Sequence, residues 1–405
     1  GIAGPAAGFT LAQYGAEVIK LDYPQLPGSI RISMEVNQGK RSILLDLKTA
    51  PGQEALRRLV VWADIVIHNS LDNVAQRLGI STAQLKAINP NVVGCQVSSL
   101  GGSKRGYWEL RPGFDPIGQQ VSGLMAHYGT LEQPHQHGMT LTTDNMGGFA
   151  LALTALVGVY QQRKTGHAGE GRCSLARVCN YIQLPYMITE NGNNDWGEAH
   201  GQFAVGDHWW QRIYACTDGW IYVGTNKDCA TVLVKAVAGH EEADVGVLER
   251  AFAKQNCAYW LNTLDAVDIA SHKVMSVTDI CEKNKIRRVD NEEADETAKG
   301  AGEILCCEDH PSGVPYITKA PDWVRIGEEQ SWKRLSPAPR SGTHTTEILE
   351  ELGYSKQEID ELITLRVAHE YIPAIGNKED YFFTPPKELI KGPKLAFDML
   401  KQETK

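Results

Sequence analysis

Strand-length apolar segments alternate with helical patterns along the first hundred residues. A helix, a turn and a strand fit residues 11–21, and the predicted elements that follow are strands at 42–47, 64–68 and 92–97 and helices at 52–61 and 83–88. Strands that alternate with helices at this spacing are typical of a mostly parallel sheet covered by helices. The pattern therefore predicts an α/β fold, in which ligands bind beyond the carboxyl ends of the strands.

Three loops follow predicted strands and are the candidate ligand loops of such a sheet. The third and longest, residues 98–116, is rich in turn-forming residues and brings Lys104 and Arg105 together with two aromatic residues. A flexible loop with basic and aromatic side chains suits a ligand that carries a nucleotide.

The most distinctive stretch, residues 139–171, contains a single carboxylate ahead of a long apolar helix. Asp144 precedes Gly147, Gly148 and the apolar run 149–160. A carboxylate at the start of a helix lies near backbone N–H groups and the positive end of the helix dipole. We therefore expect Asp144 to stay ionised and able to act as a nucleophile. Taken alone, the stretch favours a structural interpretation, in which Asp144 caps a buried helix.

The pattern changes near residue 200, where we place a domain boundary. Strand-like segments fit 213–215 and 220–223, and residues 225–305 are mainly helical and charged. Two further helices are predicted at 343–352 and 356–362.

Composition limits the class of protein. The chain has 405 residues, 42% apolar side chains and a formal net charge of −9. The length suits about two domains, and the acidic balance disfavours nucleic acid because phosphate binding needs a basic surface. With no leader and no apolar run of roughly 18 to 20 residues, we expect no membrane association and a cytoplasmic location. The nine cysteines lack metal-binding spacing and are expected to be reduced, buried thiols, with no metal site.

Five short motifs, spread from residue 1 to about residue 365, form a combined pattern. They are 3–5 with 15–20, 37–42 with 45–48, 111–115, 143–144 with 147–148, and 338–339 with 344–345 and 352–354. Each motif is weak alone, but together they resemble the family III CoA-transferases, the family of formyl-CoA and carnitine CoA-transferases.

The resemblance implies a Rossmann-like large domain with a parallel sheet, a smaller inserted α+β domain, and a C-terminal segment that returns to the large domain. We therefore expect a large CoA-binding domain at 1–200, a small domain at 201–318, and a return segment with a tail or linker at 319–405. In this family two such halves interlock. The expected partner is therefore a second copy of the chain or the second half of a tandem protein.

The resemblance also implies that Asp144 is the nucleophile of a CoA-transferase. Its carboxylate would attack a CoA thioester to give a mixed anhydride, then an aspartyl-CoA thioester that the acceptor carboxylate resolves. The N–H groups of Gly147 and Gly148 would help to hold the oxyanion, although helix packing explains both glycines equally well. CoA and acyl-CoA enter as substrates, and no tightly bound cofactor is expected.

The CoA-binding positions of the family fall on six polar residues of this chain. They are Arg31, Lys40, Asn69, Arg77, Lys104 and Arg105. The four basic residues other than Arg77 are expected near the phosphates, since an acidic protein needs local positive charge to hold a polyanion. Asn69 and Arg77 follow the third strand, where a turn residue and a helix-surface charge are the alternative readings.

Departures from the family pattern bear on the substrate. The first strand usual in the family would precede Ala3, and residues 368–405 extend beyond the usual end, so we expect a fragment or one half of a tandem protein. Ile2 stands where formyl-type enzymes have a glutamine, and 204–210 replaces their run of glycines. The acyl pocket is therefore not expected to be of formyl or oxalyl type.

Aromatic residues suggest the acceptor. His208, Trp209 and Trp210, with Tyr214, fall where the resemblance places the loop that faces Asp144. Because aromatic faces stabilise an onium group, we predict a zwitterionic acceptor of the carnitine or dimethylsulfoniopropionate kind. The family includes a dimethylsulfoniopropionate CoA-transferase/lyase made of two tandem halves. Packing of the tryptophans at a domain junction is the alternative.

Two other functions remain open at the level of sequence. The α-methylacyl-CoA racemases share the fold and the aspartate, but they use a histidine where this chain has Phe114. Proton transfer at that position needs a titratable group, which disfavours racemisation. The second alternative is a non-catalytic half that completes a partner's fold or site.

Overall fold

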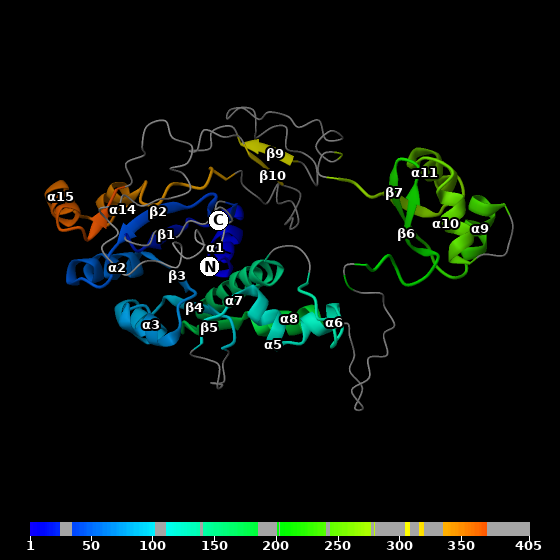
Figure 1. Cartoon of the computed structure of the whole chain (residues 1–405). Coiled ribbons are helices and arrows are strands. Elements are labelled where there is room, and N and C mark those ends of the chain that lie inside the picture. The colour runs from blue at the N-terminus through cyan, green and yellow to red at the C-terminus, as the bar shows by residue number, and fades with distance from the viewer. Residues whose placement is uncertain are drawn as a thin grey trace, which may run out of the picture. The chain divides into compact units, whose positions relative to one another are not determined.

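The computed structural model describes residues 1–24, 35–101, 111–137, 141–184, 201, 203–239, 244–276, 279, 304–307, 316–319 and 335–370. They belong to two compact units (Figure 1). Unit 1 comprises Gly1–Ser122, Met139–Asn180 and Arg287–Lys405, and unit 2 comprises Gly123–Gly138 and Tyr181–Ile286. The expected mixed α/β class with parallel strand pairing is confirmed.

Unit 1 contains a small mixed sheet and a small parallel sheet. Its strands are β1 (Ile19–Asp22), β2 (Arg41–Leu45), β3 (Ile65–His68), β4 (Val93–Ser98), β5 (Glu170–Ser174) and β11 (Ala368–His369). β1 pairs in parallel with β2, and β3, β4 and β5 pair in parallel in that order. A separate antiparallel pair joins β9 (Ile304–Cys307) to β10 (Tyr316–Lys319). Within the described residues, β1 and β3 each pair along one edge only.

Helices connect these strands. Those of unit 1 are α1 (Ala3–Gln13), the 3-10 helix η2 (Glu35–Asn37), α2 (Ala50–Trp62), α3 (Asp72–Arg77), α4 (Thr82–Ile88), α5 (Asp115–Val121), α7 (Thr142–Thr165), α8 (Leu175–Ile182), α14 (Thr345–Glu351) and α15 (Lys356–Thr364). Local capping sets several boundaries. α2 begins where the Thr49 hydroxyl accepts the N–H of Gly52 at 3.1 Å, and α15 begins with a reciprocal Ser355–Glu358 capping box.

The C-terminal part of unit 1 covers the edge of β2. The Ser42 N–H donates to Nδ1 of His344 at 3.1 Å, and the Leu44 N–H donates to Oγ1 of Thr345 at 3.2 Å. β11 then pairs antiparallel with the end of β2. These contacts satisfy strand donors at the sheet edge and give the His-Thr motif a structural role.

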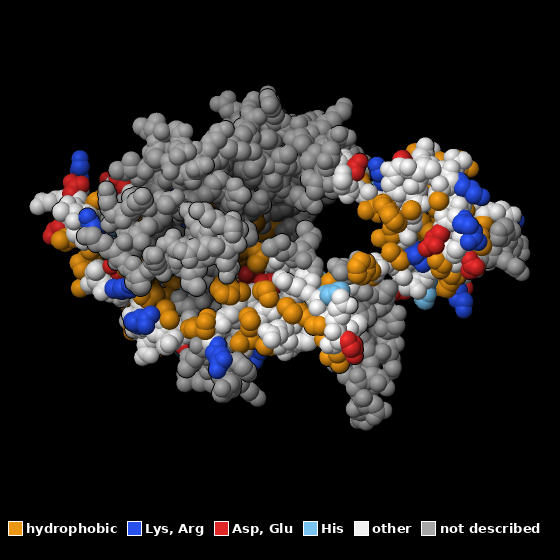
Figure 2. Space-filling model, viewed as in Figure 1, with side chains coloured by type: hydrophobic (Ala, Val, Ile, Leu, Met, Phe, Trp, Pro, Cys, Tyr) orange, Lys and Arg blue, Asp and Glu red, His pale blue; other side chains and the backbone are white. Residues whose placement is uncertain are grey.

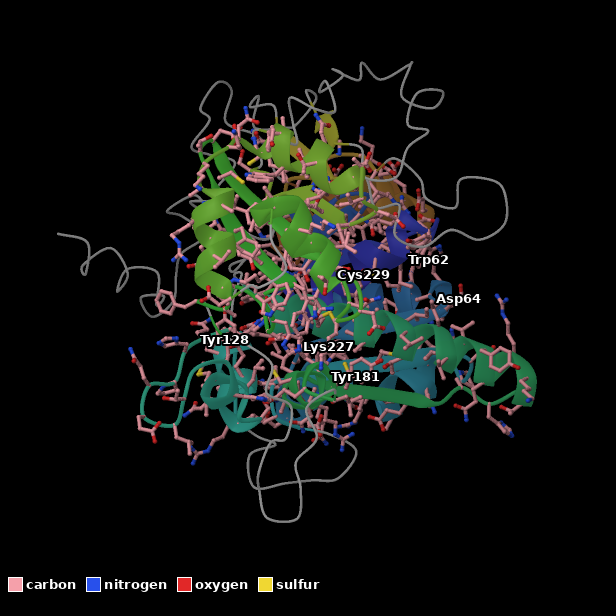
Figure 3. The ribbon with its side chains drawn as sticks, turned by 90° about the vertical axis from the view of Figure 1, so that its right-hand side faces the viewer. Trp62, Asp64, Tyr128, Tyr181, Lys227 and Cys229 are labelled. Atoms are coloured by element: carbon pink, nitrogen blue, oxygen red, sulfur yellow. The ribbon has the colours of Figure 1, made fainter. Side chains whose placement is uncertain are left out.

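Unit 2 is a small α+β unit with its own core. Its antiparallel sheet contains β6 (Gln211–Cys216), β7 (Gly219–Gly224) and β8 (Ala270–Lys273). Its helices are α6 (Leu124–Tyr128), α9 (Ala230–Ala238), α10 (Val245–Phe252) and α11 (Cys257–Asp265). The connection from β7 to α9 carries Lys227 and Cys229 (Figure 3). Leu233, Leu248 and Phe252 are fully buried in the core between α9, α10, α11 and the sheet.

Two further expectations concern the whole chain. The cysteines whose side chains are described are all free, and burial raises the pKa of the Cys95 thiol to about 11. Cys306 and Cys307 lie in β9, and their side chains fall outside the described part of the chain. Among the described helices, none combines the length and the apolar character needed to span a bilayer.

Candidate functional site

Asp144 lies in the first turn of α7, where this helix packs against α1 in unit 1 (Figure 1). The residue that precedes α7 is Leu141, which adopts a left-handed conformation with φ 66° and provides no side-chain cap. Asp144 is the third residue of the helix and is 7% exposed. The structural reading of Asp144 as an N-cap is therefore wrong, because the side chain sits inside the first turn.

A carboxylate from another helix, α5, accepts a hydrogen bond from the first turn of α7. Asp115, the first residue of α5, accepts the backbone N–H of Asp144 through Oδ2 at 3.0 Å. Its other oxygen accepts from Nε2 of Gln119 at 2.6 Å, and both Asp115 and Gln119 are fully buried. Asp115 thus satisfies one of the free donors at the start of α7, in the way that a capping side chain does.

Burial changes the acidity of Asp144. Burial first, and then the charge of Asp115, raise the pKa of the Asp144 carboxyl to about 6. The helix end favours the charged form, as expected, but loss of water outweighs the helix dipole and raises the pKa. The pKa still lies below 7, so the carboxylate is the main form at neutral pH.

The two glycines of α7 allow close packing. A Cβ on Gly147 would lie 2.6 Å from Cδ2 of Leu175 in α8, and one on Gly148 would lie 2.5 Å from Cβ of Ala6 in α1. Both residues lie inside α7, where N–H groups donate to carbonyls one turn earlier. The expectation that these N–H groups hold an oxyanion is therefore replaced by a packing role.

Lys40 is a buried residue of unit 1. Its Nζ donates to the carbonyl of Pro5 at 2.6 Å and to Oδ1 of Asn37 at 3.1 Å, and the residue is 4% exposed. Burial, and then the nearby Lys20, lower the pKa of Lys40 well below its ordinary value. Lys40 thus ties α1 to η2, and a contact with CoA phosphates does not fit this burial.

The other expected CoA residues divide into described and undescribed ones. Asn69 follows β3 and is exposed beside the first turn of α1, where its Cβ would be 3.6 Å from a Cβ on Gly4. Arg77 is exposed in the last turn of α3, and among the described residues no carboxylate pairs with it. Arg31, Lys104 and Arg105 lie outside the described residues.

The aromatic residues expected around the acceptor belong to unit 2. The ring of His208 stacks on Trp210 at 4.6 Å between centroids, and Trp209 meets Trp210 edge to face at 4.9 Å. Tyr214 is 1% exposed and donates its hydroxyl to the carbonyl of Trp209. The ring of Tyr214 stacks on Phe252 in the core of unit 2, so Tyr214 supports the cluster of His208, Trp209 and Trp210. The burial of Tyr214 does not fit direct contact with a substrate.

Asp115 and Gln119 are functional candidates that the sequence alone does not indicate, although Asp115 ends the motif at 111–115. Both follow Phe114, which stands where the racemases have a histidine. Phe114 is 69% exposed and carries no titratable group. The signal available was the spacing of Asp115 and Gln119, since residues four apart share one face of a helix. That spacing is compatible with a hydrogen bond between Asp115 and Gln119, but it does not predict that Asp115 binds the backbone of α7.

Comparisons with known proteins agree with this architecture. Residues 1–345 match the family model described as CoA-transferase family III. The chain is 32% identical over 387 residues to the CoA-transferase/lyase DddD of Marinomonas sp. (strain MWYL1), a match that covers 92% of this chain and 46% of that protein. It is 27% identical over 389 residues to the bile acid CoA-transferase BaiK of Clostridium scindens, covering 89% and 85% of the two chains. This chain thus spans about half the length of the first relative.

A solved structure shares the fold. The crystal structure of a CAIB/BAIF family protein from Brucella suis superposes with a TM-score of 0.66 at 21% identity. The match covers 87% of this chain and 96% of that chain.

Proposed function

Because the chain belongs to CoA-transferase family III, we propose that it transfers CoA from an acyl-CoA thioester to a small carboxylate through a covalent intermediate on Asp144. The main support is that the Asp144 side chain is buried without a basic partner among the described residues. Asp144 is buried in the first turn of α7, and among the described residues no lysine or arginine pairs with it. A structural carboxylate at such a depth is normally paired with a cation, whereas a nucleophile must remain available.

The proposed reaction begins with attack on the donor. An oxygen of Asp144 bonds to the thioester carbonyl carbon, the carbon–sulfur bond breaks, and CoA leaves as a thiolate. The thiolate then attacks the Asp144 carbonyl of the mixed anhydride and releases the donor acid as its carboxylate. The product of this half-reaction is an aspartyl-CoA thioester, and no oxidant, metal or external proton is consumed.

The acceptor repeats these steps in reverse. Its carboxylate attacks the aspartyl carbonyl and expels CoA thiolate, which then attacks the acceptor carbonyl of the new anhydride. Asp144 leaves as a carboxylate, and the new acyl-CoA is formed. The enzyme therefore ends in the state in which it began, with CoA as substrate and with no resident cofactor needed for the balance.

We also propose that the acceptor is an onium carboxylate, as carnitine and dimethylsulfoniopropionate are. Support comes from the exposed, stacked ring of His208 over Trp210 and from the half-buried Trp209 beside it. Aromatic faces attract a desolvated onium group by about 2 kcal/mol. Tyr214 belongs to the supporting core and not to the proposed pocket.

The proposed partner is a second copy of the chain or a second homologous half. Five large apolar residues of α7 are exposed by 38% to 67%: Phe149, Leu153, Leu156, Val157 and Tyr160. Four of them follow the 4-3-4 spacing of a helix that packs on another helix. Apolar side chains gather over the part of unit 1 that contains α7 and α8 (Figure 2). The twofold length of the first relative is consistent with such a partner.

A transfer assay tests the proposed function. Several acyl-CoA donors are incubated with plain mono- and dicarboxylates or with betaine and sulfonium carboxylates, and new CoA thioesters are separated by chromatography. We expect transfer by the wild type and by Asp64→Asn, an exposed carboxylate of the same unit (Figure 3), and none by Asp144→Asn. Equal transfer by all three proteins would remove Asp144 from the chemistry. No transfer by any protein, alone or with a partner half, would favour the non-catalytic alternative.

A further inference from the structure

Asp115 and Asp144 are two neighbouring buried carboxylates. Asp115 is fully buried and Asp144 is 7% exposed. Both oxygens of Asp115 accept from neutral donors, the amide of Gln119 at 2.6 Å and the N–H of Asp144 at 3.0 Å. Among the described residues, no lysine or arginine pairs with either carboxylate. An arrangement of this kind costs folding free energy, so it calls for a functional explanation.

We propose that Asp115 is a positioning residue that holds the first turn of α7 and opposes the negative charge of Asp144 before the reaction. The inference rests on the proposed transfer reaction and assigns a role to a residue that does not itself bond to substrate. Its hydrogen bond fixes the backbone of the nucleophile. Its charge makes the free carboxylate of Asp144 less stable than the same carboxylate would be beside a neutral cap.

The repulsion between the charges of Asp115 and Asp144 favours the first step of the reaction. Attack by Asp144 forms a carbon–oxygen bond and breaks the carbon–sulfur bond, so the negative charge leaves with the CoA thiolate. The anhydride and the aspartyl thioester are both neutral at Asp144. The repulsion between Asp115 and Asp144 is therefore present in the resting enzyme and absent in both covalent states. The pair favours the intermediates over the free carboxylate.

The same pair alters the acidity of the nucleophile. Burial, and then the charge of Asp115, raise the pKa of Asp144. The neighbouring α8 contributes the thiol of Cys179, which contacts the Thr143 hydroxyl at 3.5 Å. A carboxylate with a raised pKa is more basic and hence a stronger nucleophile, provided that the pH keeps it ionised.

The test uses Asp115→Asn, which keeps an oxygen for the Asp144 N–H and removes the charge. The Gln119 amide can turn over so that its oxygen accepts from the new side chain. Aspartate labelled with ¹³C at Cγ reports each carboxyl by NMR, and the Asp144 signal is identified by its loss in Asp144→Asn. We expect the wild-type signal to titrate near pH 6 and the Asp115→Asn signal to titrate lower by on the order of one pH unit.

A matched control is Asp244→Asn. Asp244 caps α10 in unit 2 by accepting the Val247 N–H at 2.8 Å, so it has the capping role of Asp115 without a nucleophile beside it. Its substitution is expected to leave the Asp144 titration unchanged. In single-turnover reactions with acyl-CoA, Asp115→Asn is expected to acylate more slowly than this control, and Asp115→Glu is expected to restore the wild-type titration.

The outcomes separate the two ideas. A wild-type Asp144 signal that titrates near pH 4, or an unchanged titration in folded Asp115→Asn, overturns the role of Asp115 whatever the enzyme's activity. If Asp115→Asn fails to fold, a wild-type Asp144 signal near pH 4 still overturns the proposal, because it shows no repulsion in the folded protein. If the titrations behave as expected but no acyl-CoA reacts, the proposed transfer function fails and the electrostatic coupling stands.

Discussion

Gly148 of α7 lies against Ala6 of α1 so closely that a methyl group on Gly148 would approach Cβ of Ala6 to 2.5 Å. The same methyl group would lie 3.1 Å from the carbonyl oxygen of Ala3. These are contacts to a short side chain and to backbone, which cannot move aside cheaply. The first turns of the two helices, and with them Asp144, therefore depend on the absence of a side chain at residue 148.

Gly148→Ala is accordingly predicted to separate α1 from α7. We expect a loss of about 1–3 kcal/mol in the free energy of unfolding, as for overpacked cores, and a larger loss of transfer activity than of CoA affinity. Chemical denaturation and steady-state kinetics measure both. Gly4→Ala is the control, because a Cβ there meets Asn69 at an ordinary 3.6 Å. Equal behaviour of the two variants would show that the close approach is unimportant.

The buried charge of Asp144 predicts a gain in stability when it is removed. Its pKa of about 6 in the folded protein exceeds the ordinary value of 3.8. Well below pH 3.8 the carboxyl is protonated in both states. As the pH rises from about 4 to 6 the unfolded state ionises first, so the folded state loses stability across this window. Asp144→Asn should therefore be more stable than the wild type at pH 8, by on the order of 1–2 kcal/mol, and about equal at pH 4.

Thermal unfolding at both pH values checks this prediction. Asp64→Asn serves as the exposed comparison and should show no pH-dependent gain. A gain in Asp144→Asn that is the same at pH 4 and pH 8 would mean that something other than the buried charge is responsible.

Arg77 and Lys40 should respond differently to substitution. Arg77→Ala is expected to weaken CoA binding by about 1 kcal/mol at low salt and by less at high salt, because an exposed charge is screened. Lys40→Ala should instead lower the free energy of unfolding by about 1–3 kcal/mol, since the carbonyl of Pro5 loses its buried donor. Titration calorimetry and denaturation distinguish the two effects. Arg57→Ala, an exposed arginine paired with Glu54, controls for surface charge.

If Lys40→Ala folds normally and loses CoA affinity, Lys40 contacts CoA and its purely structural role is wrong. Should Arg77→Ala match Arg57→Ala in CoA titrations at every salt concentration, Arg77 would leave the proposed site.

The exposed apolar residues of α7 predict self-association or association with a second half. Leu156→Glu is expected to weaken the assembly by at least tenfold, because a carboxylate would be buried against apolar side chains in the interface. Light scattering across a concentration series measures this effect. Leu131→Glu alters a residue that is 85% exposed and lies in unit 2, so it is the matched control. Identical assembly of both variants would exclude this face of α7.

The regular elements of unit 1 followed from the sequence because their apolar periodicity is strong. The strands expected at 42–47, 64–68 and 92–97 correspond to β2, β3 and β4. β5 has no counterpart among the predicted strands, because its sequence shows no apolar run and its pairing with β4 makes it a strand. The antiparallel pairing of β11 with β2 joins residues far apart in sequence, which no local pattern encodes.

The site was predictable in its nucleophile but not in its environment. Asp144 could be selected from the helix-start pattern and the family motif. Its burial depends on α1, α5 and α8 meeting at the start of α7, and so does its pairing with Asp115. Lys40 shows the same limit, because a basic residue directly after a glycine indicates a phosphate ligand until its buried partners are known.

The central claim is that Asp144 becomes covalently modified during transfer. The most direct measurement is an intact mass of the protein after rapid mixing with an acyl-CoA donor, followed by peptide mapping of the adduct. We predict a CoA adduct on the peptide that contains Asp144, discharged when an acceptor carboxylate is added and absent in Asp144→Asn. An unmodified Asp144 in a protein that transfers CoA, or an adduct that persists in Asp144→Asn, would contradict this account.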